Sequence, residues 1–85
     1  MTFSYKTMGT CSQLINITVE GYTIEEVKFM GGCAGSLKGI GALVKGMHID
    51  DAITKLSGIT CGFKPTSCPD QLARALKAYK EQNNL

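Results

Sequence analysis

The 85-residue chain has no tryptophan and a single histidine, His48. One histidine without a positioned carboxylate does not favour hydrolytic chemistry. No apolar run approaches the roughly 18 residues of a membrane-spanning helix, so we expect no membrane association. The formal net charge is only +2, and the nine basic residues are spread along the chain, which argues against nucleic acid as a ligand.

Residues 1–6 contain no basic stretch followed by an apolar run, so we expect no secretory signal and a cytoplasmic protein. Hydrophobic residues make up 44% of the chain and charged residues 19%, which indicates a globular protein. The length suits a single domain, which we assign to residues 1–85. Four cysteines in so short a chain are its main compositional anomaly. A reducing compartment does not favour disulfides, so these cysteines indicate metal binding or thiol chemistry.

Apolar and polar residues alternate with a period of two in the N-terminal third of the chain. Such alternation is typical of strands that bury one face. It predicts three strands, around residues 3–8, 15–20 and 27–29, and Gly9-Thr10 and Gly21-Tyr22 fit the turns between them. We therefore expect an antiparallel meander.

The remainder of the sequence has helical spacing. A first helix is predicted over residues 36–45, with Ser36 as its N-cap. Its two internal glycines, Gly39 and Gly41, each cost about 1 kcal/mol against alanine, a cost usually tolerated where a helix lies close to another backbone. A second helix over residues 49–56 has two aspartates in its first turn and a glycine just past its end.

A third helix is predicted to begin at Pro69, with Cys68 at its N-cap position, and to continue to about Lys80. Its apolar stripe includes Leu72 and Tyr79. Strands followed by helices predict an α+β fold, in which a three-stranded antiparallel sheet is followed by three helices packed on one face.

The hairpin allows two cysteines to be placed together. If the chain turns at Gly21-Tyr22, paired residue numbers in the flanking strands sum to about 43, which puts Cys11 opposite Gly32 and beside Cys33. Cys33 precedes the first helix and Cys68 opens the third, where the positive end of a helix dipole favours thiolate over thiol.

The loop of residues 62–67 is long enough for Cys61 and Cys68 to face one point. Four converging thiolates, from Cys11, Cys33, Cys61 and Cys68, would suit a tetrahedral zinc ion or an iron–sulfur cluster. No pair of cysteines forms a C-x-x-C motif, and two alternatives stay open. Two of the cysteines could cycle as a redox dithiol, or all four could be buried hydrophobic residues without a joint role. We expect a surface or capping role for His48.

The segment Thr66-Ser67-Cys68-Pro69-Asp70 reads T-S-C-P-D. On this pentapeptide and on its length and cysteine count, the chain resembles the small four-cysteine family that shares the TSCPD domain. That domain also occurs as a C-terminal domain of ribonucleotide reductases, especially of the adenosylcobalamin-dependent type. The resemblance implies a ribonucleotide reductase or another protein as partner. The chain is too short for a radical-bearing barrel, so we expect it not to be catalytic alone.

A more distant resemblance, over residues 10–80, is to the U-type iron–sulfur cluster scaffold. That family places cysteines before a β-strand, before a helix and at the start of the C-terminal helix, as Cys11, Cys33 and Cys68 stand here. This chain departs from it at Gln13, where the family has aspartate, and at Ser67, where it has histidine.

The fourth cysteine, Cys61, is an addition to that pattern. Four thiolates would hold a metal more tightly than mixed ligands, so the expected site retains its metal rather than transferring a cluster. We therefore predict a small metal-binding protein with zinc preferred over an iron–sulfur cluster. A thiol redox module that supplies electrons to a reductase, or a structural or regulatory domain, is the alternative. The sequence does not indicate an oligomeric state.

Overall fold

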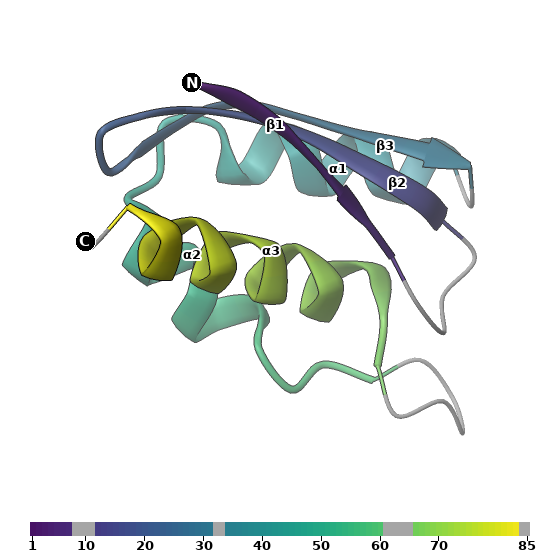
Figure 1. Ribbon diagram of the computed structural model, residues 1–85. Helices are drawn as coiled ribbons and strands as arrows, with labels where there is room; N and C mark the ends of the chain where they lie inside the picture. Colours follow the sequence, from purple (N-terminus) through teal and green to yellow (C-terminus); the bar gives the residue numbers. More distant parts are fainter. Residues whose placement is uncertain (8–11, 32–33, 61–65, 84–85) are drawn as a thin grey trace.

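The computed structural model describes residues 1–7, 12–31, 34–60 and 66–83. In these residues the chain forms three strands and then three helices, as the sequence predicts (Figure 1). None of these helices is long and apolar enough to cross a membrane. The elements are β1 (Thr2–Lys6), β2 (Ser12–Glu20), β3 (Thr23–Gly31), α1 (Ala34–Val44), α2 (Ile49–Leu56) and α3 (Cys68–Gln82).

The three strands form one antiparallel sheet in the order β1-β2-β3. Residues Gly21 and Tyr22 connect β2 to β3, which confirms that predicted turn, whereas the turn predicted at Gly9-Thr10 lies outside the described residues. Paired residue numbers sum to 43 both next to the turn and at the far end, where Ser12 pairs with Gly31. Two register shifts lie between these points, so the predicted register holds at both ends of the hairpin.

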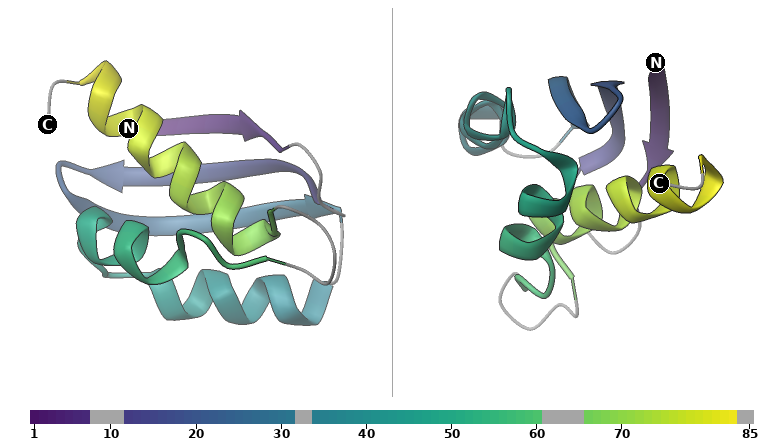
Figure 2. Two further views of the ribbon diagram at one scale, coloured as in Figure 1. Left: turned by 90° about the horizontal axis from the view of Figure 1, so that it is seen from below. Right: turned by 90° about the vertical axis from the view of Figure 1, so that its left-hand side faces the viewer.

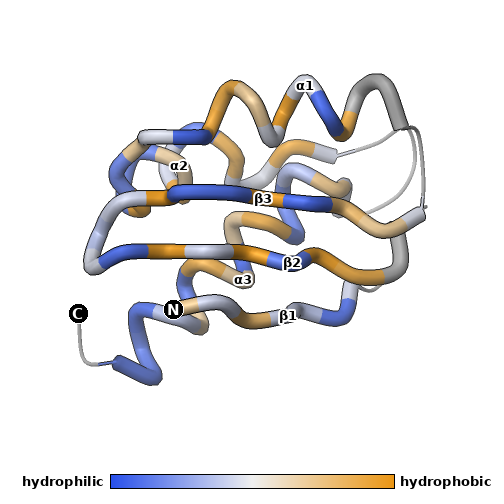
Figure 3. The backbone as a smooth tube through the Cα atoms, turned by 90° about the horizontal axis from the view of Figure 1, so that it is seen from above, coloured by the Kyte–Doolittle hydropathy of each residue, from blue (hydrophilic) through white to orange (hydrophobic). Residues whose placement is uncertain are grey.

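The alternation along the strands separates a buried face of the sheet from an exposed one (Figure 3). On the exposed face, Thr2 and Thr18 are hydrogen-bonded through their hydroxyls, and Ser4 donates to the Asn16 side chain. The buried face carries β-branched residues, two positions apart in β2 as the sequence periodicity predicts and three positions apart in β3, where the pairing register shifts. These are Ile15, Ile17, Val19, Ile24 and Val27, and they form the core together with Val44, Ile49, Leu72, Leu76 and Tyr79.

The helices lie on the buried side of the sheet and along one of its edges. Figure 2 shows α2 and α3 beneath the strands and α1 alongside β3. A side chain at Gly41 of α1 would place its Cβ 2.8 Å from the carbonyl oxygen of Val27. Glycine at this position therefore allows the helix to approach the edge strand, which is the predicted reason for its presence. No such contact exists at Gly39, whose Cβ would meet nothing within 4 Å.

Two predicted helix starts are wrong by one or two residues. The first helix begins at Ala34, so Ser36 lies inside it rather than at its N-cap. The third begins at Cys68, and its N-cap is Ser67, whose hydroxyl accepts a hydrogen bond from the Asp70 amide at 3.2 Å. A hydroxyl oxygen is a much better hydrogen-bond acceptor than a thiol, so Ser67 takes the cap and Cys68 becomes the first helical residue.

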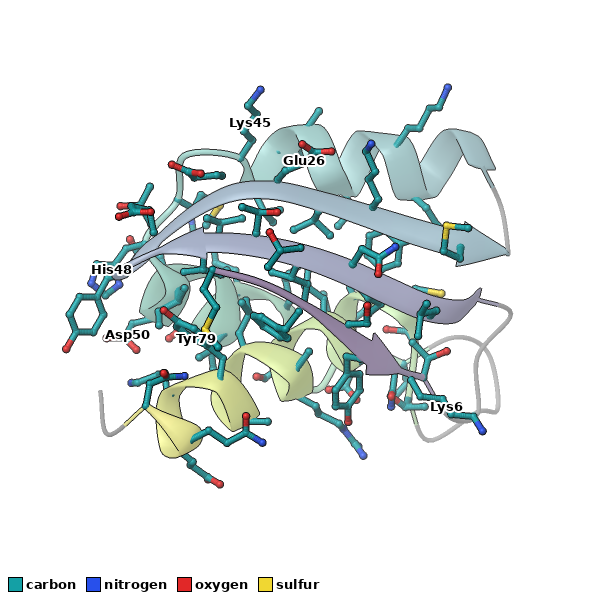
Figure 4. The ribbon with its side chains drawn as sticks, turned by 45° about the horizontal axis from the view of Figure 1, so that its top comes forward. Lys6, Glu26, Lys45, His48, Asp50 and Tyr79 are labelled. Atoms are coloured by element: carbon teal, nitrogen blue, oxygen red, sulfur yellow. The ribbon has the colours of Figure 1, made fainter. Side chains whose placement is uncertain are left out.

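The two ends of the sheet differ in the segments that they contain. The hairpin end contains Gly21 and Tyr22; the loop end contains Lys6, Ser12 and Gly31. Figure 4 shows Lys6 at the loop end, and His48, Asp50 and Tyr79 toward the opposite end.

Helix α3 connects these two ends. Near its C-terminus, the Tyr79 hydroxyl donates to the Gly21 carbonyl at 3.0 Å, and the Tyr79 ring stacks on Phe3 with ring centroids 5.4 Å apart. Cys68 lies eleven residues earlier, about 16 Å along the helix axis. Helix α3 therefore begins toward the loop end of the sheet, as Figures 1 and 2 show.

Candidate metal centre

Cys68 is the one predicted metal ligand that lies within the described residues. It is buried, with 7% of its surface exposed, and it is the first residue of α3. Ser67 caps this helix, and Pro69 supplies the fixed backbone angle that suits the first turn. The unpaired amides of a first turn give it a partial positive charge, which stabilises a thiolate. Cys68 therefore lies at the positive end of a helix dipole, as the sequence predicts, but as the first helical residue and not as the N-cap.

A buried polar cluster surrounds the first turn of α3 and is centred on Asp70. The Asp70 carboxylate accepts hydrogen bonds from the Thr66 hydroxyl at 2.5 Å, from the Gly58 amide at 2.7 Å and from Arg74 Nε at 3.0 Å. The Gln71 side-chain amide donates to the Thr66 oxygen at 2.9 Å. Three of the five residues, Thr66, Asp70 and Gln71, are buried and bond one another, as burial of polar groups requires, whereas Gly58 and Arg74 are exposed.

The environment of Asp70 keeps it ionised. The hydrogen bond from Thr66 is the largest influence and holds the pKa of the Asp70 carboxyl below its ordinary value of 3.8. The Gly58 amide and Arg74 act in the same direction, and burial opposes them. Asp70 is thus a fixed anion in a buried setting, and its role is to bind backbone and side-chain donors.

These bonds join the two segments that flank residues 61–65. Before those residues, Gly58 donates to Asp70, and the Ile59 carbonyl accepts a hydrogen bond from the Ser67 hydroxyl at 2.6 Å. After them, Thr66 and Ser67 lie against the first turn of α3. The chain on both sides of Cys61 in the sequence is therefore fastened to the helix that Cys68 opens.

The other predicted ligands lie outside the described residues. Cys11, Cys33 and Cys61 belong to the segments 8–11, 32–33 and 61–65. Within residues 1–7, 12–31, 34–60 and 66–83, no three histidine, cysteine, aspartate or glutamate side chains are grouped to hold a metal. The sequence neighbours of two of these cysteines are described: Ser12 pairs with Gly31 at the loop end, and α1 begins at Ala34.

His48 has a capping role, as the sequence predicts, and is not part of the polar cluster. Its Nδ1 accepts a hydrogen bond from the Asp50 amide at 3.1 Å and so caps α2. Its ring stacks on Tyr22 at the hairpin end, with centroids 5.0 Å apart.

The structure gives four positions of the pentapeptide T-S-C-P-D a role at the start of α3. Thr66 donates to Asp70, Ser67 caps the helix, Pro69 begins its first turn, and Asp70 holds the preceding segment. Sequence reasoning identified Cys68 and Pro69 but missed the roles of Thr66 and Asp70. The signal for this helix start was Ser67 three residues before Asp70, which is the spacing of a capping box.

The fold and this cluster define a small α+β domain whose C-terminal helix opens on a buried cysteine. The family model of the TSCPD domain matches residues 2–80, so the chain belongs to the TSCPD-domain family. No curated protein and no solved structure matches the chain. The links to ribonucleotide reductase and to the U-type scaffold therefore stay predictions.

Proposed function

We propose that the domain holds one metal centre with Cys11, Cys33, Cys61 and Cys68. The observation that carries the proposal is the position of Cys68, which is buried at the capped start of α3. The length of that helix places its start toward the loop end of the sheet. Cys11 and Cys33 adjoin, in sequence, elements that begin or end at the loop end.

The four cysteine thiols suit metal binding. Four thiols in one small domain match the ligand chemistry of structural zinc and of iron–sulfur clusters. Zinc is preferred, because a closed site of four thiolates leaves no open position for a substrate and because no feature of the described residues calls for electron transfer. When bound, the metal would supply a cross-link between elements rather than a reactive centre.

The physical role of such a centre follows from its four sequence positions. They adjoin the start of β2, the start of α1, the segment after α2 and the start of α3. A metal bound there would fasten the helices to the end of a sheet of only three strands. Part of its binding free energy would then be folding free energy, as in other small metal-dependent domains.

We further propose that the domain acts as an accessory or docking module for a ribonucleotide reductase. The support is the resemblance of the TSCPD family to a C-terminal domain of those enzymes. A purified reductase assayed with and without an equimolar amount of this protein tests this part, and unchanged activity together with no complex in sedimentation would contradict it.

The metal proposal is tested by coupling metal content to stability. Protein purified without an affinity metal column is treated with a strong chelator and melted before and after addition of zinc. We expect chelation to lower the melting temperature and zinc to restore it. Each of the four Cys→Ser variants should lose both the bound metal and this response.

Thr60→Ala provides the matched control, because Thr60 is exposed and directly precedes Cys61. It should retain the metal and the chelator response of the wild type. If all four Cys→Ser variants stay as metal-loaded and as stable as the wild type, the proposal is wrong. A reversible disulfide with a defined potential in metal-free protein would instead favour the thiol redox module.

A further inference from the structure

A groove of about 450 Å³ lies between β3 and α1, apart from the candidate metal centre. Its floor is apolar and well packed: Val27 and Leu37 are buried, and a side chain in place of Gly41 would collide with the Val27 carbonyl. Met30 also lines the groove, with 51% of its surface exposed. An exposed methionine beside a preformed apolar floor is a feature of adaptable binding surfaces.

The rim of the groove is predominantly basic. Lys28, Lys38 and Lys45 line it together with one acidic residue, Glu26. Glu26 is already paired with Lys28 at 3.1 Å. All seven acidic side chains of the protein are among the described residues, and none of them forms an ion pair with Lys38 or Lys45. Two lysines of the rim therefore offer charge that the domain itself does not compensate.

The geometry of the edge restricts how a partner could bind. β3 is an edge strand of the sheet, and such strands often accept an additional strand. Here α1 already lies along this edge (Figure 2), and a Cβ at its Gly41 would collide with the Val27 carbonyl. Recognition must therefore use side chains across the groove. Figure 4 shows Glu26 and Lys45 on the side of the molecule that faces away from α3.

We propose that this groove binds an acidic segment of another protein. An apolar side chain of the segment enters between β3 and α1, and its carboxylates meet Lys38 and Lys45. The apolar floor excludes water from the contact, and the lysine rim selects the sign of the partner's charge and speeds its association.

Amide chemical-shift mapping with a defined probe tests the proposal. The probe is a twelve-residue peptide of glutamates interrupted by leucines, titrated into nitrogen-15-labelled protein. We expect shift changes confined to residues 26–30 and 37–45, with an affinity that falls severalfold as salt is raised. A control peptide in which alanine replaces leucine should bind more weakly, because it cannot fill the apolar floor.

Charge reversal supplies the matched variants. The double variant Lys38→Glu and Lys45→Glu should weaken peptide binding by about tenfold. Lys55→Glu and Lys77→Glu, on the exposed faces of α2 and α3, change the net charge equally and should change the affinity by less than about twofold. All four lysines are exposed, so neither variant should affect folding.

Four results would overturn the proposal. The first is no binding at millimolar peptide, and the second is an equal effect of the two double variants. The third is a stronger response of the same residues to inorganic tripolyphosphate or to a single-stranded oligonucleotide than to the peptide, which would indicate a phosphate site. The fourth is a set of shifts that grows with protein concentration alone, which would indicate that a second copy occupies the groove.

Discussion

The Thr66 hydroxyl donates a 2.5 Å hydrogen bond to the Asp70 carboxylate, and both side chains are buried at the start of α3. This bond closes the short segment that contains Ser67, Cys68 and Pro69. The same carboxylate accepts the Gly58 amide from the other side of residues 61–65. The bond between Thr66 and Asp70 thus fixes the backbone of Cys68 at the helix start. The bond from Gly58 attaches the segment before Cys61 to the same helix start.

Replacement of Thr66 by valine tests this relationship. The variant keeps the shape but removes the donor to Asp70 and the acceptor for Gln71, so we expect a loss of about 2 kcal/mol in the free energy of unfolding. The pKa of the Asp70 carboxyl should rise, because the Thr66 bond is the largest influence lowering it. Urea unfolding and a carboxyl NMR titration measure the two effects. Thr66→Ser keeps the hydroxyl and should retain the low pKa.

Asp70→Asn tests the charge of the cluster through pH. Because folding lowers the pKa of Asp70 below its ordinary value of 3.8, the carboxylate adds stability above that value. This contribution is lost as the pH falls through the lowered pKa. We expect the variant to be destabilised by about 2 to 4 kcal/mol at neutral pH and to show a shallower loss of stability on acidification.

Urea unfolding between about pH 7 and pH 2 measures that slope. Asp51→Asn is the control, since Asp51 is exposed in the first turn of α2 and forms no ion pair within the described residues. It should retain the acid profile of the wild type. Identical profiles for Asp70→Asn and the wild type would show that the cluster does not hold a buried anion.

Alanine substitution of two glycines in α1 should change the stability of the protein in opposite directions. Gly41→Ala places a Cβ 2.8 Å from the Val27 carbonyl oxygen, so α1 must shift away from β3, at a cost of about 1 to 3 kcal/mol. Gly39→Ala meets nothing within 4 Å and should stabilise the helix by up to about 1 kcal/mol. Equal effects of the two substitutions on the urea midpoint would show that α1 does not approach the edge strand closely.

Tyr79→Phe tests the contact that sets the direction of α3. The variant keeps the stack on Phe3 but removes the hydrogen bond to the Gly21 carbonyl, so we expect a loss of about 1 kcal/mol. Tyr5→Phe is the control, because Tyr5 is half-buried and no hydrogen bond of its hydroxyl is found within the described residues. Equal stability of Tyr79→Phe and the wild type would contradict the role of this bond.

Most of the fold follows from local pattern. The alternation about Ile15 and Ile17 identified a strand with one buried face, and the turn at Gly21-Tyr22 set the register at both ends of the hairpin. The second helix matches residues 49–56 at both ends, because a capping side chain and a following glycine mark its limits. Such signals lie within a few residues of the structure that they determine.

The polar cluster could be predicted less well, because it depends on contacts between distant segments. Nothing local to Gly58 indicates that its amide donates to a carboxylate twelve residues later. The predicted cap of α3 is one residue late, because the Ser67 hydroxyl accepts a hydrogen bond better than the Cys68 thiol does. The convergence of the four cysteines remains a prediction, since three of them lie outside the described residues.

Metal content of the purified protein shows most directly whether the four cysteines hold a metal. Protein prepared without oxygen and without an affinity metal column is measured by mass spectrometry, beside its visible absorption spectrum. We expect about one zinc per chain and no colour, and a near-complete loss of that zinc in Cys68→Ser. Iron with sulfide and brown absorption would keep the four-cysteine centre but change its metal. Metal-free protein with four titratable thiols would contradict a four-cysteine metal centre.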